Sequence, residues 1–425
     1  MTDAAVARPS RHLVFDYQIV VNAVFALFIF FGMLSLIEPS PYDFLALLAI
    51  PVWFVGGFRL PRALLPILAL WFLFEAAGFL SLMPYWDEHD PRTYQFQSLY
   101  LFVTTIFFTI FFSERSEERA TLCLKAFTAG ALVSAVVGFI GYFNIAGLGP
   151  ALTTYEGRVS GTFKDPNVFG SYLILSAAYL LQIILLGRTR RLLFSMAGLL
   201  IILLGIFVSF SRGSWGATLG ALILVVCTGY VTADTPALRS RIARMTVAAG
   251  FMGLLTVGGM LSIHSVRTFF FERAEVAQDY DEGVTGRFGN QIRSLPMLVE
   301  RPAGFGPLRF RLVFGLEPHN SYIGGFANDG WLGGFPWIAI VLTSCFVGFR
   351  LMLVRSPYRQ LAQVYAPTMF VLLVQGMQID VDHWRQLFLC FGAVWGLEAA
   401  RLRWSKAVSH NPAAPARASR AITHE

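Results

Sequence analysis

The sequence predicts an all-α, polytopic membrane protein with about twelve transmembrane helices, and three observations lead to this fold class. Of the 425 residues, 56% are hydrophobic and 14% are charged, whereas an ordinary soluble domain is about 25% charged. Apolar runs long enough to span a bilayer, which takes about 20 residues, follow one another along the chain. The short loops between these runs carry Lys and Arg mainly on alternate sides. Such a chain has too little polar surface to cover a water-soluble core.

The apolar runs form two groups of spans on either side of one long loop. We expect a polar segment at 1–16, nine helices within 17–264, a loop at 265–320, three helices within 321–404 and a tail at 405–425. The tail is rich in Ala, Pro and Arg, so we expect it to be disordered. The expected spans are 17–37, 41–58, 63–82, 96–112, 120–143, 167–186, 192–210, 214–232, 245–264, 321–349, 360–379 and 384–400.

The basic residues predict the orientation of these spans. With the N-terminus inside the cell, most of the 33 Lys and Arg residues fall in cytoplasmic loops. Of the 12 that fall outside, seven lie in the 265–320 loop, where the charge rule has little force because the loop is long. We therefore expect both termini in the cytoplasm and the 265–320 loop outside. This bias accounts for the net charge of +7, so the lipid bilayer is an expected partner and nucleic acid is not.

Neither the cysteines nor the acidic residues predict a metal site. The four cysteines lie within or at the edge of apolar runs and form no close pairs, so we interpret them as small buried hydrophobes. The acidic turns at 87–90 and 380–382 are the only candidates for a metal. Both are short and polar, and we interpret them as solvated loops. We therefore expect no metal and no cofactor.

Three outside segments are richer in polar groups than simple connectors. The first contains Arg158 and Lys164, followed by Asp165 as a candidate N-cap and Pro166 as a candidate first helical residue. Two cations beside the positive end of a helix would attract an anion. The alternative is a surface turn in which both cations are solvated.

The second outside segment, 209–215, places Arg212 between two apolar runs. Because this turn is too short to reach far from the membrane, Arg212 is expected to pair with another group or to serve function. The alternative is an arginine that snorkels to the membrane interface.

The third outside segment is the 265–320 loop with the start of the span that follows it. Residues 285–300 are expected to form an amphipathic helix that stops at Pro302. The apolar stripe of this helix is Phe288, Ile292, Leu295 and Val299, and its polar flank is Arg287, Asn290 and Ser294.

His319 lies at the entrance of the tenth span, where the dipole of the helix favours a neutral imidazole. A neutral imidazole can act as a general base, although the alternative is a structural histidine that caps the turn. Arg158, Arg212, Arg287 and His319 all fall on one side of the membrane. Because arginine binds phosphate bidentately, this set suits a diphosphate-bearing donor and the deprotonation of a hydroxyl acceptor.

At these same residues the sequence resembles the O-antigen ligase / O-antigen polymerase family of bacterial membrane glycosyltransferases. His319-Asn320, nine further residues and then Gly330-Trp331-Leu332-Gly333 look like the family signature H-[NSQ]-x9-G-x-x-[GTY]. Three more blocks are similar to family blocks and occur in the family's order: Gly157-Arg158 to Gly170, Ser211-Arg212-Gly213, and Gly286-Arg287 leading to Pro302-Ala303-Gly304-Phe305-Gly306-Pro307.

The resemblance implies a fold of the membrane-embedded glycosyltransferase (GT-C-like) type, with a large periplasmic helical loop over the active site. It implies transfer of a glycan from undecaprenyl diphosphate to a sugar hydroxyl, at the periplasmic face of the bacterial inner membrane. It also implies an inverting mechanism without a metal. On this view Arg212 and Arg287 hold the diphosphate, His319 takes the acceptor proton, and the substrate-binding residues are Arg158, Lys164, Arg293 and Asn320.

The sequence leaves the acceptor open. It could be lipid A core (a ligase), another lipid-linked glycan (a polymerase) or a protein Ser/Thr (an oligosaccharyltransferase). Polymerases of the family are described with two R-x10-G repeats; Arg293 to Gly304 fits that spacing, whereas Arg158 to Gly170 is one residue too long. The rival from another class is a polysaccharide flippase or transporter, which is expected to carry ionisable residues within its spans, such as Glu75 or Lys125.

Overall fold

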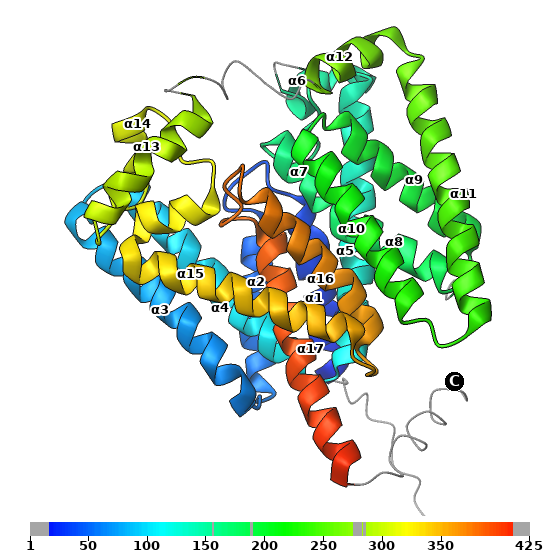
Figure 1. The fold of residues 1–425 in the computed structure, drawn as a ribbon, viewed down its shortest axis with the longest axis horizontal. Helices are drawn as coiled ribbons and strands as arrows, with labels where there is room; N and C mark the ends of the chain where they lie inside the picture. Colours follow the sequence, from blue (N-terminus) through cyan, green and yellow to red (C-terminus); the bar gives the residue numbers. More distant parts are fainter. Residues whose placement is uncertain (1–16, 155–156, 188–189, 275–282, 284–285, 411–425) are drawn as a thin grey trace, which may run out of the picture.

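The computed structural model describes residues 17–154, 157–187, 190–274, 283 and 286–410, and this part of the chain is built from helices (Figure 1). An isolated bridge between Thr153 and Val159 is the only β-type pairing within these ranges. The expected segments at 1–16 and 411–425 lie outside the described residues.

Every expected span contains a helix, but the helices in the last two expected spans are not among those with the length and composition of a membrane span or of a shorter apolar helix. The bounds differ from expectation mainly where polar residues begin or end a helix, as in the helices that begin at His89 and at Pro236. The sixth span consists of two helices that meet at Leu173. The helices are α1 (Tyr17–Phe30), α2 (Pro41–Val55), α3 (Leu65–Leu82), α4 (His89–Ser113), α5 (Ser116–Tyr142), α7 (Pro166–Tyr172), α8 (Ile174–Leu185), α9 (Leu192–Val208), α10 (Arg212–Val231), α11 (Pro236–Leu261), α15 (Ser321–Leu353), α16 (Arg359–Gln375) and α17 (Arg385–His410).

Length and composition show that the chain is a multi-pass membrane protein. In the described part of the chain, seven helical stretches are long and apolar enough to cross a bilayer: α3, α4, α5, α7 with α8, α10, α11 and α15. Three shorter apolar helices, α1, α2 and α9, accompany them. The expectation of an all-α, polytopic membrane fold is therefore confirmed.

The centre of the bundle is held together by helix pairs that are distant in sequence. The most extensive packing is between α4 and α17, followed by α3 with α15 and α10 with α16. A stack of aromatic rings fills the space between α1 and α4, where Phe25 packs on Phe111 at 4.3 Å and Phe28 on Phe108 at 5.7 Å between ring centroids. These rings are buried, so dispersion and apolar burial stabilise the pairing of the first and fourth helices.

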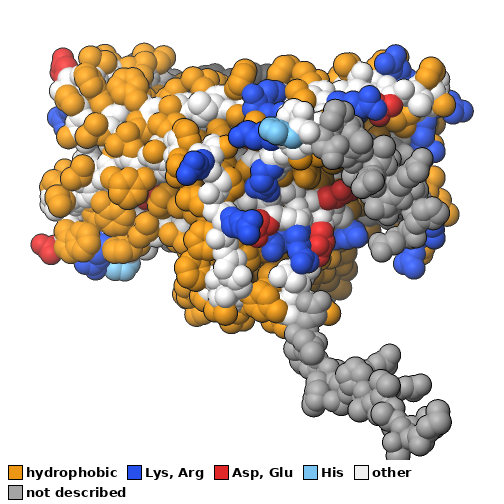
Figure 2. All heavy atoms as spheres, turned by 90° about the horizontal axis from the view of Figure 1, so that it is seen from below, with side chains coloured by type: hydrophobic (Ala, Val, Ile, Leu, Met, Phe, Trp, Pro, Cys, Tyr) orange, Lys and Arg blue, Asp and Glu red, His pale blue; other side chains and the backbone are white. Residues whose placement is uncertain are grey.

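The rim of the bundle is apolar and open. Helix α11 stands at the edge of the molecule in Figure 1, and only 6% of its most apolar stretch is buried inside the protein. Figure 2 shows one face of the molecule with hydrophobic side chains over its left part and along much of its edge, and Lys and Arg side chains from its middle to its right-hand side. This is the distribution that a bilayer requires, with apolar atoms toward lipid and cations at the aqueous ends.

The long loop contains its own helices, α12 (His264–Ala274), α13 (Arg287–Glu300) and α14 (Phe310–Phe314). The expected amphipathic helix is α13. Its apolar side faces away from the protein, and its polar side packs against the protein. Its stripe is 44–69% exposed, whereas Asn290, Gln291 and Ser294 are buried. The polar face packs inward because its amides donate to backbone carbonyls, from Asn290 to Phe314 at 3.2 Å and from Gln291 to Pro318 at 2.9 Å.

The C-terminal tail begins later than expected. Helix α17 continues through 405–410, which we had expected to be disordered. Before this extension, the carboxylate of Glu398 in α17 accepts hydrogen bonds from Arg350 of α15 and from Arg401 of α17 itself. The contact with Arg350 ties α17 to α15 upstream of its last turns.

The α4–α17 contact predicts a position where a larger side chain disrupts the fold. A side chain at Gly392 would overlap the Cβ of Phe108, whereas Gly250 on α11 has open space around it. Overpacking of this kind costs about 1–3 kcal/mol. We expect Gly392→Val to lower the thermal midpoint of the purified protein and Gly250→Val to change it much less. Equal midpoints for the two variants would show that this contact is not tightly packed.

Candidate functional site

Three of the arginines singled out in the sequence meet in one small cavity, which we call the arginine cavity. It has a volume of about 100 Å³, and Arg158, Arg212 and Arg287 line it. The remaining lining residues come from the start of α7, the α9–α10 turn and the end of α16 with the loop after it: Asn167, Phe210, Ser211, Gly213, Gln375, Gln378 and Ile379.

Arg158 is held by the start of α7 and the end of α9. Its Nη2 donates to the side-chain oxygen of Asn167 at 2.8 Å, and its Nε donates to the carbonyl of Ser209 at 3.3 Å. Asn167 is in turn fixed because Asp165 caps α7 and accepts from the backbone N–H of Asn167. The predicted cap is therefore present, and it positions a partner of Arg158.

Arg212 occupies the first position of α10, directly after a sharp turn. Phe210 has a left-handed backbone (φ +47°), and the hydroxyl of Ser211 caps α10 by accepting from the N–H of Ser214 at 3.3 Å. This geometry brings the α9–α10 turn to the arginine cavity, and Arg212 lines it. A functional role of Arg212, as opposed to snorkelling to the membrane interface, stays a prediction.

Arg287 opens α13 and connects the long loop to the other side of the cavity. Its Nη1 donates to the carbonyl of Gln378 at 3.0 Å, and its guanidinium lies 4.8 Å from the ring centroid of Phe288. Planar guanidinium groups from three separate elements therefore converge on one space. Such a cluster is suited to binding an oxyanion with several oxygens.

His319 pairs with an acidic side chain that we had interpreted as solvated. Its Nδ1 lies 3.3 Å from the Oδ2 of Asp380, and the two side chains are 43% and 34% exposed. His319 also has a left-handed backbone (φ +47°), which is uncommon for residues other than glycine. Because Nδ1 faces the carboxylate, Nε2 is the ring nitrogen placed to accept a proton.

Asn320 has a structural position in this turn. Its side-chain oxygen caps α15 by accepting from the N–H groups of Tyr322 and Ile323 at 3.0 and 3.1 Å. Its amide nitrogen donates to Met377, and its backbone N–H donates to Asp380 at 3.0 Å. These contacts fix the start of α15, while a role of Asn320 in substrate binding stays a prediction.

The signature glycine of α15 has a clear structural reason. Gly330 has φ +65° and interrupts the helix, and a side chain there would overlap the backbone of Pro302 and Ala303. The N–H of Trp331 donates to the carbonyl of Pro302 at 2.8 Å. The motif therefore docks the end of the α13 segment onto α15.

The 376–384 loop, between α16 and α17, joins the two parts of the site. Its Gln378 accepts from Arg287, and its Asp380 pairs with His319. Asp382 accepts from the Tyr94 hydroxyl at 2.7 Å and lies 3.3 Å from Nδ1 of His383, and its side chain is only 17% exposed. The interpretation of 380–382 as a solvated loop was wrong, because these carboxylates are paired with groups from α4 and α15.

Asp382 and His383 shift each other's protonation. Burial raises the pKa of Asp382, but the hydrogen bond and charge of His383 and the Tyr94 hydroxyl outweigh burial, so the pKa is lowered. Burial lowers the pKa of His383, yet the Asp382 carboxylate outweighs it and the pKa is raised. The pair is therefore held in its charged form.

Two predicted substrate-binding residues lie elsewhere. Nζ of Lys164 is 3.2 Å from Oε2 of Glu38, with both side chains partly exposed. Arg293 donates to Asn290 at 3.2 Å and lies 5.6 Å from the ring centroid of Phe314. In the described structure neither residue lines the arginine cavity.

The second acidic turn is also paired. Asp90 lies 3.1 Å from Nη2 of Arg311, and Glu88 forms an ion pair with Arg309. Residues 87–90 therefore contact the segment around α14, but the side chains of Glu88 and Asp90 are 50% and 64% exposed, as expected for a solvated turn. Across the described ranges no group of three or more His, Cys, Asp or Glu residues is arranged to hold a metal ion.

An apolar groove of about 480 Å³ lies between α8, α9, α10 and α11. At one end of it, Phe207 of α9 stacks on Trp215 of α10 with ring centroids 5.6 Å apart. Phe210, which lines the arginine cavity, packs against both rings at 6.0 and 6.3 Å. Phe210 therefore links the wall of the arginine cavity to two aromatic rings of the groove.

Comparison with known proteins adds no relative: no family model matches the chain, and no curated protein matches it significantly. The assignment of chemistry therefore rests on the residues and on their geometry. Sequence reasoning missed Asn167, Gln378 and Asp380 as partners of the cationic groups. For Asp380 a signal was available in the sequence: two aspartates, Asp380 and Asp382, stand next to His383 in the short connection between two spans.

The Asp382–His383 pair predicts a pH dependence of stability. Because the folded pKa of His383 is raised above 6.5, its contribution is complete below that pH and is lost as pH rises through the folded value. We expect the thermal midpoint to fall on alkaline titration, and to fall less in His383→Gln. His264→Gln, at an exposed histidine, is the control. Parallel profiles for His383→Gln and wild type would contradict this role.

Proposed function

We propose that the protein is an inverting, metal-independent glycosyltransferase of the O-antigen ligase type. It would move a glycan from undecaprenyl diphosphate to a sugar hydroxyl acceptor. The observation that carries this proposal is the convergence of Arg158, Arg212 and Arg287 in one cavity. A loop that contacts Arg287 also holds the His319–Asp380 pair.

The donor we propose is lipid-linked because an apolar groove adjoins the arginines. A polyprenyl chain would occupy the groove between α9, α10 and α11, and its diphosphate would lie at the arginine cavity past Phe210. Lipid reaches this groove from the side, since α11 is barely packed against the protein. A soluble nucleotide-sugar donor would have no use for such a surface.

The proposed reaction is a single displacement. Nε2 of His319 takes the proton of the acceptor hydroxyl, while Asp380 holds Nδ1 protonated and the ring in place. The acceptor oxygen attacks the anomeric carbon as the bond to the diphosphate oxygen breaks, which inverts the configuration. Arg212 and Arg287 stabilise the negative charge that develops on the leaving diphosphate.

We further propose twelve spans, a GT-C-like fold and the orientation given by the charge rule. The face in Figure 2 would be cytoplasmic, and the end carrying α13 would face the periplasm of a bacterial inner membrane. Exposed cations at the helix ends of the proposed cytoplasmic face support this assignment. They include Arg115, Arg244, Arg355, Arg403 and Lys406.

The transfer reaction can be tested with purified protein and a native undecaprenyl-diphosphate glycan. We expect Arg212→Lys and Arg287→Lys to transfer far more slowly than wild type, because an ammonium cannot replace the bidentate guanidinium. His319→Ala should lose about 10²–10⁴-fold in rate. Arg267→Lys, at an exposed arginine of α12, should leave the rate unchanged.

Two outcomes of this assay would overturn the assignment. Wild-type rates for both lysine variants would remove the arginines from the diphosphate site. Inhibition by EDTA with rescue by Mg²⁺ or Mn²⁺ would require a metal-dependent mechanism. Supplying lipid A core, a second lipid-linked glycan or a Ser/Thr peptide as acceptor distinguishes ligase, polymerase and oligosaccharyltransferase.

A flippase is the second candidate, and one observation favours it. Glu75 of α3 is 3% exposed within a span, where Ser98 donates to it at 2.7 Å and Gln95 at 3.2 Å. Buried ionisable groups in spans commonly mark transport pathways. Formation of a new glycosidic bond by the purified protein would decide against this candidate.

The orientation has its own test. Single cysteines at Ser240 and Ser262, both exposed, would be introduced into a variant without native cysteines. An impermeant maleimide added to intact spheroplasts should label Ser262→Cys, while Ser240→Cys should react only after lysis. The reverse pattern would place the arginine cavity on the cytoplasmic side.

A further inference from the structure

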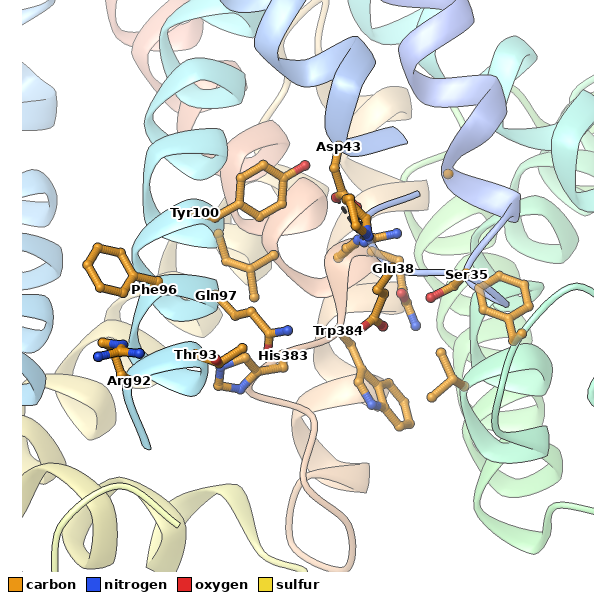
Figure 3. Close-up of a pocket in the computed structure, with 17 residues that line it drawn as sticks. Ser35, Glu38, Asp43, Arg92, Thr93, Phe96, Gln97, Tyr100, His383 and Trp384 are labelled. Atoms are coloured by element: carbon orange, nitrogen blue, oxygen red, sulfur yellow. Dashed lines mark hydrogen bonds and ion pairs between the residues drawn. The ribbon is translucent and has the colours of Figure 1, made fainter. Parts of the chain in front are cut away.

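A second cavity, of about 670 Å³, lies at the starts of α2, α4, α7 and α17 (Figure 3). We call it the aromatic cavity because rings from separate elements line it. Phe96 and Tyr100 come from α4, Phe163 precedes α7, and Trp384 precedes α17. The size is typical of a ligand site, and the function proposed above leaves the cavity unused.

Polar side chains line the aromatic cavity together with these rings. Figure 3 shows Gln97 of α4 and Glu38 of the segment before α2 reaching into the same space. Thr93, one turn away on α4, also lines the cavity. Amide, carboxylate and hydroxyl groups of this kind donate and accept hydrogen bonds and suit a ligand rich in hydroxyl groups.

The charged groups of the wall have partners, although not all of these partners line the cavity. Arg92 donates to the carbonyl of Trp86 at 3.3 Å, and Glu38 lies 3.2 Å from Nζ of Lys164. Arg385 donates to both carboxylate oxygens of Asp43 at 2.8 and 2.9 Å, and to Ser40 at 3.0 Å. The two ring nitrogens of His383 face Asp382 and the carbonyl of Tyr94. In the wall as a whole Arg92 and Arg385 are balanced by Glu38 and Asp43, and His383 is balanced by Asp382, so the cavity favours a neutral polar ligand over a phosphate. The paired groups also keep the wall rigid before a ligand binds.

The aromatic cavity and the arginine cavity share two walls. On α7, Asn167 lines the arginine cavity and the next residue, Val168, lines the aromatic cavity. The 376–384 loop does the same, with Gln378 on one side and His383 on the other. The two cavities are therefore neighbours, and a long molecule with its reacting end at the arginines would have its remaining length close to the aromatic cavity.

We infer that the aromatic cavity binds sugar rings of a glycan that reacts at the arginine cavity. Sugar rings present C–H faces that pack on aromatic rings, and hydroxyls that bond to planar amide and carboxylate groups. The inference rests on the proposed glycosyl transfer. The glycan has two possible sources, the sugars of the donor and the sugars of the acceptor, and the experiment separates them.

The test uses the full chain in lipid nanodiscs, because a maltoside detergent would itself present sugar rings. Phe96→Ala and Gln97→Ala alter exposed side chains of the wall. Phe72→Ala, at a 68% exposed phenylalanine of α3, is the matched control. We expect each wall variant to raise KM about tenfold for one substrate, with kcat little changed. The substrate affected, undecaprenyl-diphosphate glycan or lipid A core, identifies the source.

Failure of this inference differs from failure of the proposed function. Wild-type transfer with unchanged KM for both substrates in both wall variants would show that the cavity holds no sugar. If wild type transfers nothing, saturation-transfer NMR with delipidated core oligosaccharide and with glycan released from the donor still measures binding. Signals in wild type that vanish in the double variant would support the sugar site, and absence of signals in wild type would overturn it.

Discussion

The 376–384 loop connects α16 to α17 and makes the contacts on which the site depends. Through Gln378 it fixes Arg287 at the start of α13, and through Asp380 it fixes His319 at the start of α15. The N–H of Ser321 donates to the carbonyl of Gly376 at 2.8 Å, which ties the first turn of α15 to the same loop. Because these partners are distant in sequence, their positions are set only once α15, α16 and α17 have packed together.

The polar contacts of this end of the bundle form a connected system. Tyr94 of α4 donates to Asp382 and accepts from the side chain of Asn328 at 2.9 Å, so α4 and α15 join the same network. A buried polar group costs free energy unless it is hydrogen-bonded, and a network that satisfies its members becomes rigid. Rigid placement of cations and of a base is what phosphate binding and proton transfer require.

Packing and site geometry depend on different features of the same helices. Apolar stripes and small residues bring the helices together, as where α17 passes Phe108 of α4 at Gly392. The ends of the helices then place the polar groups. Arg212 and Arg287 are the first residues of their helices, and His319 directly precedes the N-cap of α15. Helix starts supply positive backbone dipoles at the same end of the molecule, which adds to the attraction for an anion.

The sequence by itself determined the all-α membrane fold and pointed to Arg158, Arg212, Arg287 and His319, because hydropathy and motif spacing are local properties of the chain. Only the tertiary structure decided which of the polar residues meet. It separated Lys164 and Arg293 from the arginine cavity, paired His319 with Asp380, and turned the apolar face of α13 outward. The physical reason is that contacts between helix ends depend on how non-adjacent helices pack, and helical periodicity within one segment carries no information about its neighbours.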